Sequence, residues 1–296
     1  MPDYPNIPYY HIDHLIAEGG TARVYWGIDL RSGFPVAIKE LKIRHLSNPI
    51  IRQKFRDMEA QLYLYAQHPR IPKLVDFIDN AQKNQMFIIM EFVEGRSLEQ
   101  YIYRQCGPIP EERALPLFLQ VLDTVGFLHR IKIPHMQVDN GILHLDIKSN
   151  NIMLLPGDRE IKLIDLGIAS RLSDMSNSTG FGTPAYMPPE QFEKGHCGKF
   201  TDIFALGIML FEMLSGHLPF VSNESSGRRQ VEDIRDKIKN HPTPQMRQYY
   251  PFVNDELQTI VERALRKQPF ERYQSCEDFA RDIENYMNRH RKHFKR

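Results

Sequence analysis

Residues 144–151 read His-Leu-Asp-Ile-Lys-Ser-Asn-Asn, and residues 165–167 read Asp-Leu-Gly. In this short span Asp146 is a candidate base, and Lys148 is a cation that can neutralise a phosphate. Asn151 and Asp165 supply an amide oxygen and a carboxylate, the hard oxygen ligands that magnesium prefers. Both halves of the pattern occur in this order, so the stretch predicts a site for magnesium and a phosphorylated ligand.

The length and composition are those of a globular enzyme. A chain of 296 residues exceeds the usual size of one simple domain, so one large two-lobed domain or two domains are expected. Hydrophobic residues make up 42% and charged residues 25% of the chain. The net charge of +1 gives no electrostatic reason to expect a nucleic acid or a membrane as partner.

The cysteines and the N-terminus bear on the cellular compartment. Cys106, Cys197 and Cys276 lie far apart and fit neither a disulfide framework nor zinc spacing, which favours a reducing, cytoplasmic location. The N-terminus lacks a basic-then-apolar signal, and no stretch approaches the ~18 apolar residues that span a membrane. Whether the chain is one part of a longer protein stays open.

The first part of the chain reads mostly as strands. Residues 21–30 and 34–41 are rich in β-branched and apolar residues and flank Arg31-Ser32-Gly33, a hairpin signal. Ser47-Asn48-Pro49 has the capping and proline signature of a helix start, and this helix should end near residue 67, before His68-Pro69. Two further strands are predicted at residues 73–79 and 85–92.

After Glu94-Gly95 the pattern becomes helical. A helix of apolar periodicity is predicted from Pro110 to Leu128, with acidic residues at its N-terminus. Residues 202–214 are apolar nearly all round, which predicts a buried central helix. Amphipathic helices are predicted at residues 256–265 and 276–288. The fold class is therefore α+β, with a small β-rich part and a larger helical part.

The order H-x-D-x-K-x-x-N, then D-x-G, resembles the catalytic and metal-binding loops of the protein kinase superfamily. Val36-Ala37-Ile38-Lys39 resembles the family's lysine-bearing strand, and Gly182-Thr183-Pro184-Ala185-Tyr186-Met187-Pro188-Pro189-Glu190 the end of an activation segment. The resemblance covers residues 10–285 and looks most like the bacterial eukaryotic-like (Hanks-type) serine/threonine kinases. It implies a two-lobed kinase fold, with an N-lobe at 1–93 containing one regulatory helix and a C-lobe at 94–296.

The family resemblance implies an ATP-dependent protein kinase that uses Mg²⁺ and phosphorylates serine or threonine hydroxyls of proteins. Asp146 would accept the proton of the attacking hydroxyl, Lys148 would neutralise the γ-phosphate, and Asn151 and Asp165 would hold Mg²⁺. Most of the catalysis would come from positioning and charge neutralisation. Leu166 replaces the usual phenylalanine, and it is apolar enough to pack under the helix that carries the regulatory glutamate.

The stretch 16–24 is similar to the family's glycine-rich loop, whose backbone N–H groups approach phosphate oxygens. Only the middle glycine, Gly19, matches, because Ala17 and Ala22 replace the outer two. The hinge at residues 90–93 would bind adenine through its backbone. The nucleotide contacts that the resemblance implies are Ala17, Gly19, Val24, Ala37, Lys39, Met90, Glu91, Val93 and Met153.

Lys39 lies inside an apolar strand, where a lysine is unusual unless its ammonium has a partner. Without the rest of the chain, an edge-strand lysine in water would be the preferred interpretation. In the family, this lysine contacts the α- and β-phosphates and pairs with a glutamate on the following helix. Glu59 is the natural candidate; Asp57 is the alternative, about 200° away round an α-helix.

Three further residues have structural counterparts in the family. Glu190 would pair with Arg272, and Asp202 would anchor the backbone of the catalytic loop; neither role is chemical.

Lys148 and Thr183 both favour serine/threonine over tyrosine as the phosphorylated residue.

Leu145 departs from the family pattern, since many kinases carry an arginine here that clamps a phosphorylated activation segment. We therefore hypothesise that activity does not require phosphorylation of this segment. Candidate phosphosites are Ser173, Ser176, Ser178 and Thr179, for which Arg171 and Lys162 are weaker partners.

Two other classes of function stay open. A pseudokinase, which binds nucleotide or proteins without turnover, is mildly favoured by the altered glycine-rich loop and Leu145, but the retained polar residues at 39, 59, 146, 148, 151 and 165 oppose it. A kinase for small molecules is opposed by the long segment 165–190, which suits a peptide platform. The oligomeric state, the role of residues 131–140 and that of the basic residues 289–296 also stay open.

Overall fold

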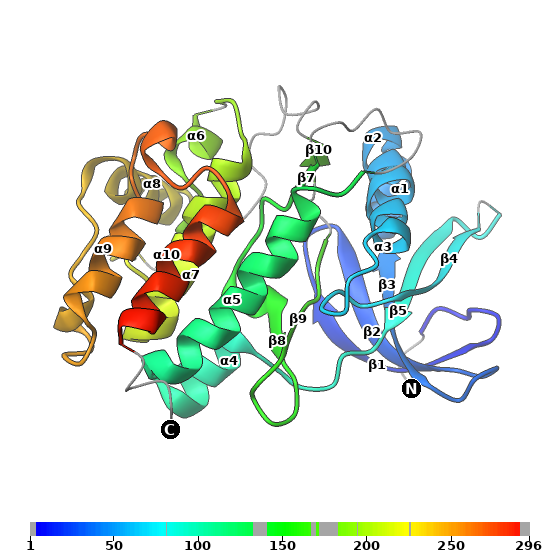
Figure 1. Cartoon of the computed structure of the whole chain (residues 1–296). Helices are drawn as coiled ribbons and strands as arrows, with labels where there is room; N and C mark the ends of the chain where they lie inside the picture. The colour runs from blue at the N-terminus through cyan, green and yellow to red at the C-terminus, as the bar shows by residue number, and fades with distance from the viewer. Residues whose placement is uncertain are drawn as a thin grey trace. The chain divides into compact units, whose positions relative to one another are not determined.

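The computed structural model describes residues 4–80, 82–132, 141–166, 170–171, 183–193, 195–224 and 226–290, apart from the side chains of Lys54, Met58, Ser170 and Arg171. The chain divides into two compact units, Met1–Glu94 and Gly95–Arg296. Figure 1 shows the first unit in blue to cyan and the second in green to red. Residues 133–140, the proposed phosphosites and the end of the basic tail lie outside the described ranges.

The first unit is built on a five-stranded antiparallel sheet with the order β1-β2-β3-β5-β4. Gly33 forms the hairpin turn between β2 and β3 at φ +76°, a conformation that glycine adopts without a steric penalty. The four predicted strands are confirmed, and β1 completes the sheet. The strands are β1 (Tyr10–Glu18), β2 (Ala22–Asp29), β3 (Pro35–Leu41), β4 (Leu74–Asn80) and β5 (Gln85–Glu91).

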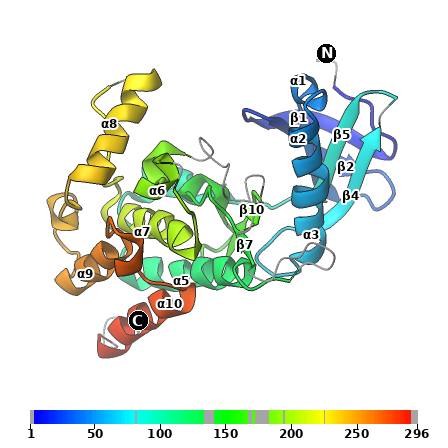
Figure 2. The ribbon, with the colours of Figure 1, turned by 90° about the horizontal axis from the view of Figure 1, so that it is seen from above.

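One helical column accompanies this sheet. The short α1 (Ile43–Leu46) precedes α2 (Pro49–Gln53), a π-helical segment (Lys54–Ala60) and α3 (Gln61–Tyr65). Asn48 caps the start, because its side-chain oxygen accepts the N–H of Ile50 at 3.0 Å. Figure 2 shows the column alongside the strands. The predicted helix is confirmed, with a π-helical segment, a feature often found at functional sites.

The second unit is mainly helical. Its centre is α7 (Lys199–Ser215), in which every residue from Thr201 to Ser215 is buried, as predicted for a helix that is apolar nearly all round. α7 packs against α5 (Glu111–Leu128) and α9 (Asp255–Ala264), and α5 packs against α10 (Cys276–Arg289). Figure 1 shows α5, α7 and α10 running beside one another. The other α-helices among the described residues of this unit are α4 (Leu98–Tyr101), α6 (Pro189–Phe192) and α8 (Gly227–Asn240).

Short strands and turns hold residues 144–151. β7 (Ile142–Leu143) pairs with β10 (Ser170–Arg171), and β8 (Ile152–Leu154) lies between β6 (Arg96–Ser97) and β9 (Ile161–Leu163). Residues 144–151 therefore form the loop from β7 to β8, and end in a 3₁₀ turn at Ser149–Asn151. Among the described residues, no helix is both long and apolar enough to cross a membrane. The architecture is the predicted α+β fold.

Candidate active site

The loop at residues 144–151 is anchored by Asp202, at the start of α7. The two carboxylate oxygens of Asp202 accept the backbone N–H groups of His144 and Leu145, each at 2.8 Å. One of these oxygens also contacts Nε2 of His129 at 2.8 Å. This is the structural role predicted for Asp202; the contribution of His129 was missed.

Electrostatics favours the ionised form of Asp202. Burial by itself would raise its pKa, but the hydrogen bonds from His129 and from the N–H of His144 lower it below its ordinary value. A carboxylate that accepts three hydrogen bonds is stable in this buried position, and can hold the loop from its first residues.

Leu145 adopts an unusual conformation in this loop. Its φ of +65° lies in the left-handed region, which costs a branched L-residue about 1–2 kcal/mol. The bond from its N–H to Asp202 and the burial of its side chain with Leu143 and Cys197 hold it there. The side chain that replaces the usual arginine thus packs in an apolar cluster of the second unit.

Asp146 lies at the centre of a polar cluster. Its Oδ2 accepts a bond from Nζ of Lys148 at 2.8 Å, and its Oδ1 accepts the hydroxyl of Thr183 at 2.9 Å. Lys148 also donates to the Thr183 hydroxyl at 2.9 Å, which closes a three-membered ring of contacts. Asp146 and Lys148 were predicted to act together, but the participation of Thr183 came only from the structure.

Asn151 and Asp165 are brought to the same end of a β-hairpin. Because Ile152 of β8 pairs with Leu163 of β9, the residue before β8 and the residues after β9 lie at one end. Asn151 donates its side-chain N–H to the backbone oxygen of Asp146 at 2.9 Å, so its Oδ1 is the atom left to act as a ligand. Asp165, partly exposed, is the second residue after β9.

In the first unit, Lys39 on β3 contacts the π-helical segment between α2 and α3. Nζ of Lys39 on β3 contacts Oε1 of Glu59 in the π-helical segment, and both residues are buried. The structure thus pairs Lys39 with Glu59 rather than with Asp57. A buried lysine requires a partner of opposite charge, which explains how this strand tolerates it.

The loop between β1 and β2 is a tight turn, closed by a bond from the N–H of Gly19 to the oxygen of Ala22 at 2.9 Å. Ala17 pairs with Val24 at the base of this turn. A Cβ added at Gly20 would meet no atom within 4 Å, so the fold of the chain itself does not demand glycine there.

Several predicted nucleotide contacts share neighbouring strands. Val24 on β2 pairs with Lys39 on β3, and Ala37 on β3 pairs with Met90 on β5. Met90 is buried, whereas Ala37 and Val24 are partly exposed. The others are Glu91, the last residue of β5; Val93, buried just after it; and Met153 on β8 of the second unit, opposite Ser97.

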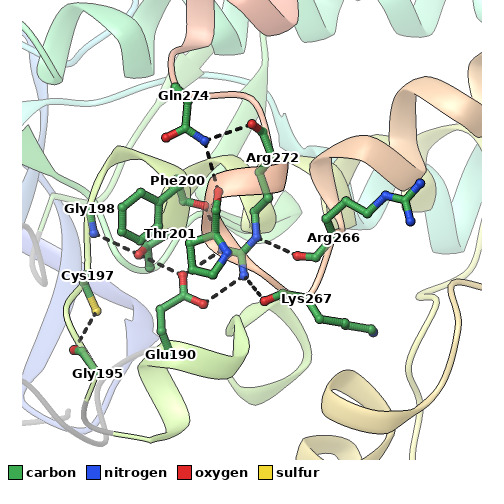
Figure 3. Close-up of polar contacts among 11 residues, drawn as sticks. Glu190, Gly195, Cys197, Gly198, Phe200, Thr201, Arg266, Lys267, Arg272 and Gln274 are labelled. Atoms are coloured by element: carbon green, nitrogen blue, oxygen red, sulfur yellow. Dashed lines mark hydrogen bonds and ion pairs between the residues drawn. The ribbon is translucent and has the colours of Figure 1, made fainter.

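The end of the activation segment is fixed by a buried ion pair. Arg272 donates two parallel bonds to Glu190, at 2.7 and 2.9 Å, as predicted. Figure 3 shows that its guanidinium also reaches backbone oxygens. These belong to Arg266, Lys267 and Phe200, at 2.7, 3.0 and 3.0 Å.

A buried carboxylate that the sequence interpretation missed is Glu212 on α7. Its oxygens accept bonds from the hydroxyls of Tyr186 at 2.5 Å and Ser149 at 3.1 Å. Burial raises the pKa of Glu212 above its ordinary value, although its hydroxyl donors oppose this. The signal was present, because a glutamate in a helix that is otherwise apolar all round needs buried partners.

Comparisons with known proteins show the family to which the chain belongs. The protein kinase domain family matches residues 10–283. The serine/threonine-protein kinase PrkC of Bacillus subtilis (strain 168) is 33% identical over 290 residues, 97% of this chain and 42% of PrkC. The serine/threonine-protein kinase PknB of Mycolicibacterium smegmatis is 30% identical over 281 residues, 93% of this chain and 42% of PknB.

These matches define the class: the chain belongs to the protein kinase family. Within that family, its relatives include bacterial Hanks-type serine/threonine kinases, as the sequence predicted. The chain spans less than half the length of these two relatives.

Proposed function

We propose that this chain is an ATP-dependent serine/threonine protein kinase. The observation that carries the proposal is the contact ring of Asp146, Lys148 and Thr183. A carboxylate for the incoming hydroxyl and an ammonium for the transferred phosphate are what phosphoryl transfer to an alcohol requires. The assignment of this activity also follows the names of the relatives.

In the proposed mechanism, Asp146 orients the hydroxyl of a protein serine or threonine and accepts its proton. Lys148 lies 2.8 Å from Asp146, close enough to balance negative charge as the γ-phosphoryl group approaches. Thr183 bonds to both side chains, so it fixes the direction of the carboxylate before substrate arrives. Positioning of this kind is the main contribution a protein makes to phosphoryl transfer.

Lys39 is proposed to contact the α- and β-phosphates of ATP, with Glu59 setting the position of its ammonium. The backbone around Gly19 would cover the phosphates. The adenine ring would contact the hinge backbone at Glu91 and Val93, and the apolar side chains at positions 24, 37, 90 and 153.

Mg²⁺ fits the donor set that Asn151 and Asp165 offer, because the amide nitrogen of Asn151 is used by the backbone of Asp146 and its oxygen remains. A bound Mg²⁺ would neutralise phosphate charge. The residues named above supply the other contacts of the proposed site.

We place the domain in the cytoplasm, a proposal that rests on its three free cysteines.

The proposed base is tested by Asp146→Asn. This change keeps the size of the side chain and removes its negative charge, so transfer from ATP should fall at least about 100-fold while nucleotide binding is retained. Asp236→Asn on the exposed face of α8 makes the same chemical change outside the site, and should transfer at the wild-type rate. Equal rates for wild type and Asp146→Asn would show that the base is assigned wrongly.

The role of the strand lysine is tested by Lys39→Met. The variant loses the cation that Glu59 holds, so misplaced phosphates should lower kcat at least about tenfold. Steady-state kinetics with ATP and a basic protein measures this. A variant with wild-type kcat and KM for ATP would remove Lys39 from the proposed site.

A further inference from the structure

Three buried side chains of the second unit contact one another in a row, and they come from α10, α7 and the residue that follows α5. Sγ of Cys276, the first residue of α10, lies 3.8 Å from Nδ1 of His129, which follows α5. Nε2 of His129 lies 2.8 Å from Oδ2 of Asp202 on α7. The exposed fractions are 2% for Cys276, 3% for His129 and 0% for Asp202, so water does not compete for these contacts.

Close packing brings this row together. A Cβ added at Gly126 of α5 would lie 3.2 Å from Cβ of Cys276, so a glycine allows α10 to approach α5 this closely. On the other side, Gly141 has a φ of +80°, and an added Cβ there would collide with the backbone oxygen of His129. His129 is thus held between α10 and the segment that leads into β7.

The donors and acceptors in this row fix where the protons lie. The Asp202 carboxylate can only accept, so Nε2 of His129 carries the hydrogen of the bond between them. In the neutral ring, Nδ1 is then an acceptor. Burial and the charge of Asp202 raise the pKa of the Cys276 thiol, so Cys276 keeps its S–H and can donate it to Nδ1.

The row continues into the catalytic loop. The Asp202 carboxylate that accepts from His129 also accepts the N–H groups of His144 and Leu145. Leu145 is held at φ +65°, and the next residue is Asp146. The direction of the Asp202 carboxylate therefore sets the backbone that carries Asp146.

We propose that Cys276 is a positioning residue, whose S–H donates to Nδ1 of His129 and selects the ring tautomer that orients Asp202 beneath the catalytic loop. The effect on catalysis rests on the proposed function of Asp146. The thiol performs no chemistry and touches no reacting atom. Its role is to keep Nδ1 of His129 an acceptor and Nε2 a donor.

The proton positions are tested by NMR of the whole chain labelled with ¹⁵N in its histidine rings, with His129→Gln used to assign the signals. The wild type should show His129 as a single neutral tautomer with hydrogen on Nε2. Cys276→Ala should change the Nδ1 signal, and Cys276→Ser, which keeps a donor, should restore it. Hydrogen on Nδ1 in the wild type, or no change in Cys276→Ala, overturns the proposal.

The consequence for catalysis is tested with the wild type, Cys276→Ala and Cys276→Ser. Cys276→Ala should lower kcat roughly three- to tenfold with KM for ATP unchanged, the size expected for one hydrogen bond in a buried network. Cys276→Ser should recover most of the loss. A kcat in Cys276→Ala equal to that of wild type, or equal losses in both variants, contradicts the positioning role.

The two proposals fail in different ways. If the wild type transfers no phosphate, the kinase activity is wrong, and the NMR spectra alone decide the tautomer. If the wild type is active and Asp146→Asn is not, the proposed function stands whatever the Cys276 variants do. Thermal unfolding of each variant shows whether a lost activity is instead a lost fold.

Discussion

At the scale of single residues, the most informative departure from the family pattern is Leu145. A leucine cannot pair with a phosphate, and here it is 6% exposed and packed with Leu143 and Cys197. The left-handed backbone of this residue is held by the bond from its N–H to the Asp202 carboxylate, not by a charge on its own side chain. The loop is thus anchored from within the second unit.

This arrangement predicts that activity does not depend on phosphorylation of the activation segment. A variant with alanine at Ser173, Ser176, Ser178 and Thr179 should keep kcat within about twofold of wild type, since Leu145 offers no charge to order a phosphorylated segment. Steady-state kinetics after phosphatase treatment measures this. Loss of activity in a variant that unfolds at the wild-type temperature would refute the idea.

A second residue-scale prediction concerns Glu212. Because its pKa in the folded protein is raised, its contribution to stability is greatest at low pH and falls as pH rises through the folded-state pKa. Glu212→Gln removes this titration. Its amide oxygen can accept one of the two hydroxyls of Tyr186 and Ser149, and its NH2 group can donate to the oxygen of the other. The melting temperature of the variant relative to wild type should therefore increase from pH 5 to pH 8.

A difference in melting temperature that stays constant across this range would mean that Glu212 does not titrate differently in the folded and unfolded states.

The contribution of Asp202 to stability depends on pH in the opposite direction, because its pKa in the folded protein is lowered. Its stabilisation is present above the ordinary pKa of an aspartate and is lost as pH falls towards the folded-state pKa. Comparing Glu212→Gln with wild type cancels this contribution.

At the scale of elements, long periodic or alternating segments could be predicted from the sequence, and short irregular ones could not. α7 was predicted because an apolar run of its length has to be buried, and the β2–β3 hairpin because Arg31-Ser32-Gly33 separates two apolar runs. The π-helical segment has no periodicity signal, since only the local register of its hydrogen bonds differs from an α-helix.

The candidate site shows the same division. Asp146, Lys148, Asn151 and Asp165 could be named from their spacing, and their proximity follows from the β7-to-β8 loop and the β8–β9 hairpin. The contacts of His129 and Cys276 could not be predicted, because they join residues 147 positions apart in the sequence. Nothing in a single sequence ties α10 to α5 in this register.

The buried ion pair between Arg272 and Glu190, at the end of the activation segment, leads to a prediction about stability. Arg272→Met leaves the buried carboxylate of Glu190 without its charged partner and should destabilise the second unit by about 3–5 kcal/mol. Arg281→Met, which removes an exposed pair with Asp278 on α10, is the matched control and should cost less than about 1 kcal/mol. Urea unfolding measures both. Similar costs for the two variants would contradict the role of the buried pair.

At the scale of the whole molecule, two compact units carry different parts of the proposed chemistry. The first unit contributes Lys39 and the glycine-bearing turn, and the second contributes the cluster around Asp146. PrkC and PknB are more than twice as long as the stretch matched here, so their full activities belong to longer chains. The kinase domain is the part that this chain shares with them.

The measurement that tests the central claim most directly is transfer from ATP labelled in the γ-phosphate, with Mg²⁺, to the chain itself and to a generic basic protein, followed by acid hydrolysis. A serine/threonine kinase with Asp146 as its base should give labelled phosphoserine or phosphothreonine from the wild type and none from Asp146→Asn. No labelled amino acid from the wild type, with nucleotide binding still detected by thermal shift, would contradict the proposed kinase activity and leave a protein that binds nucleotide without turnover.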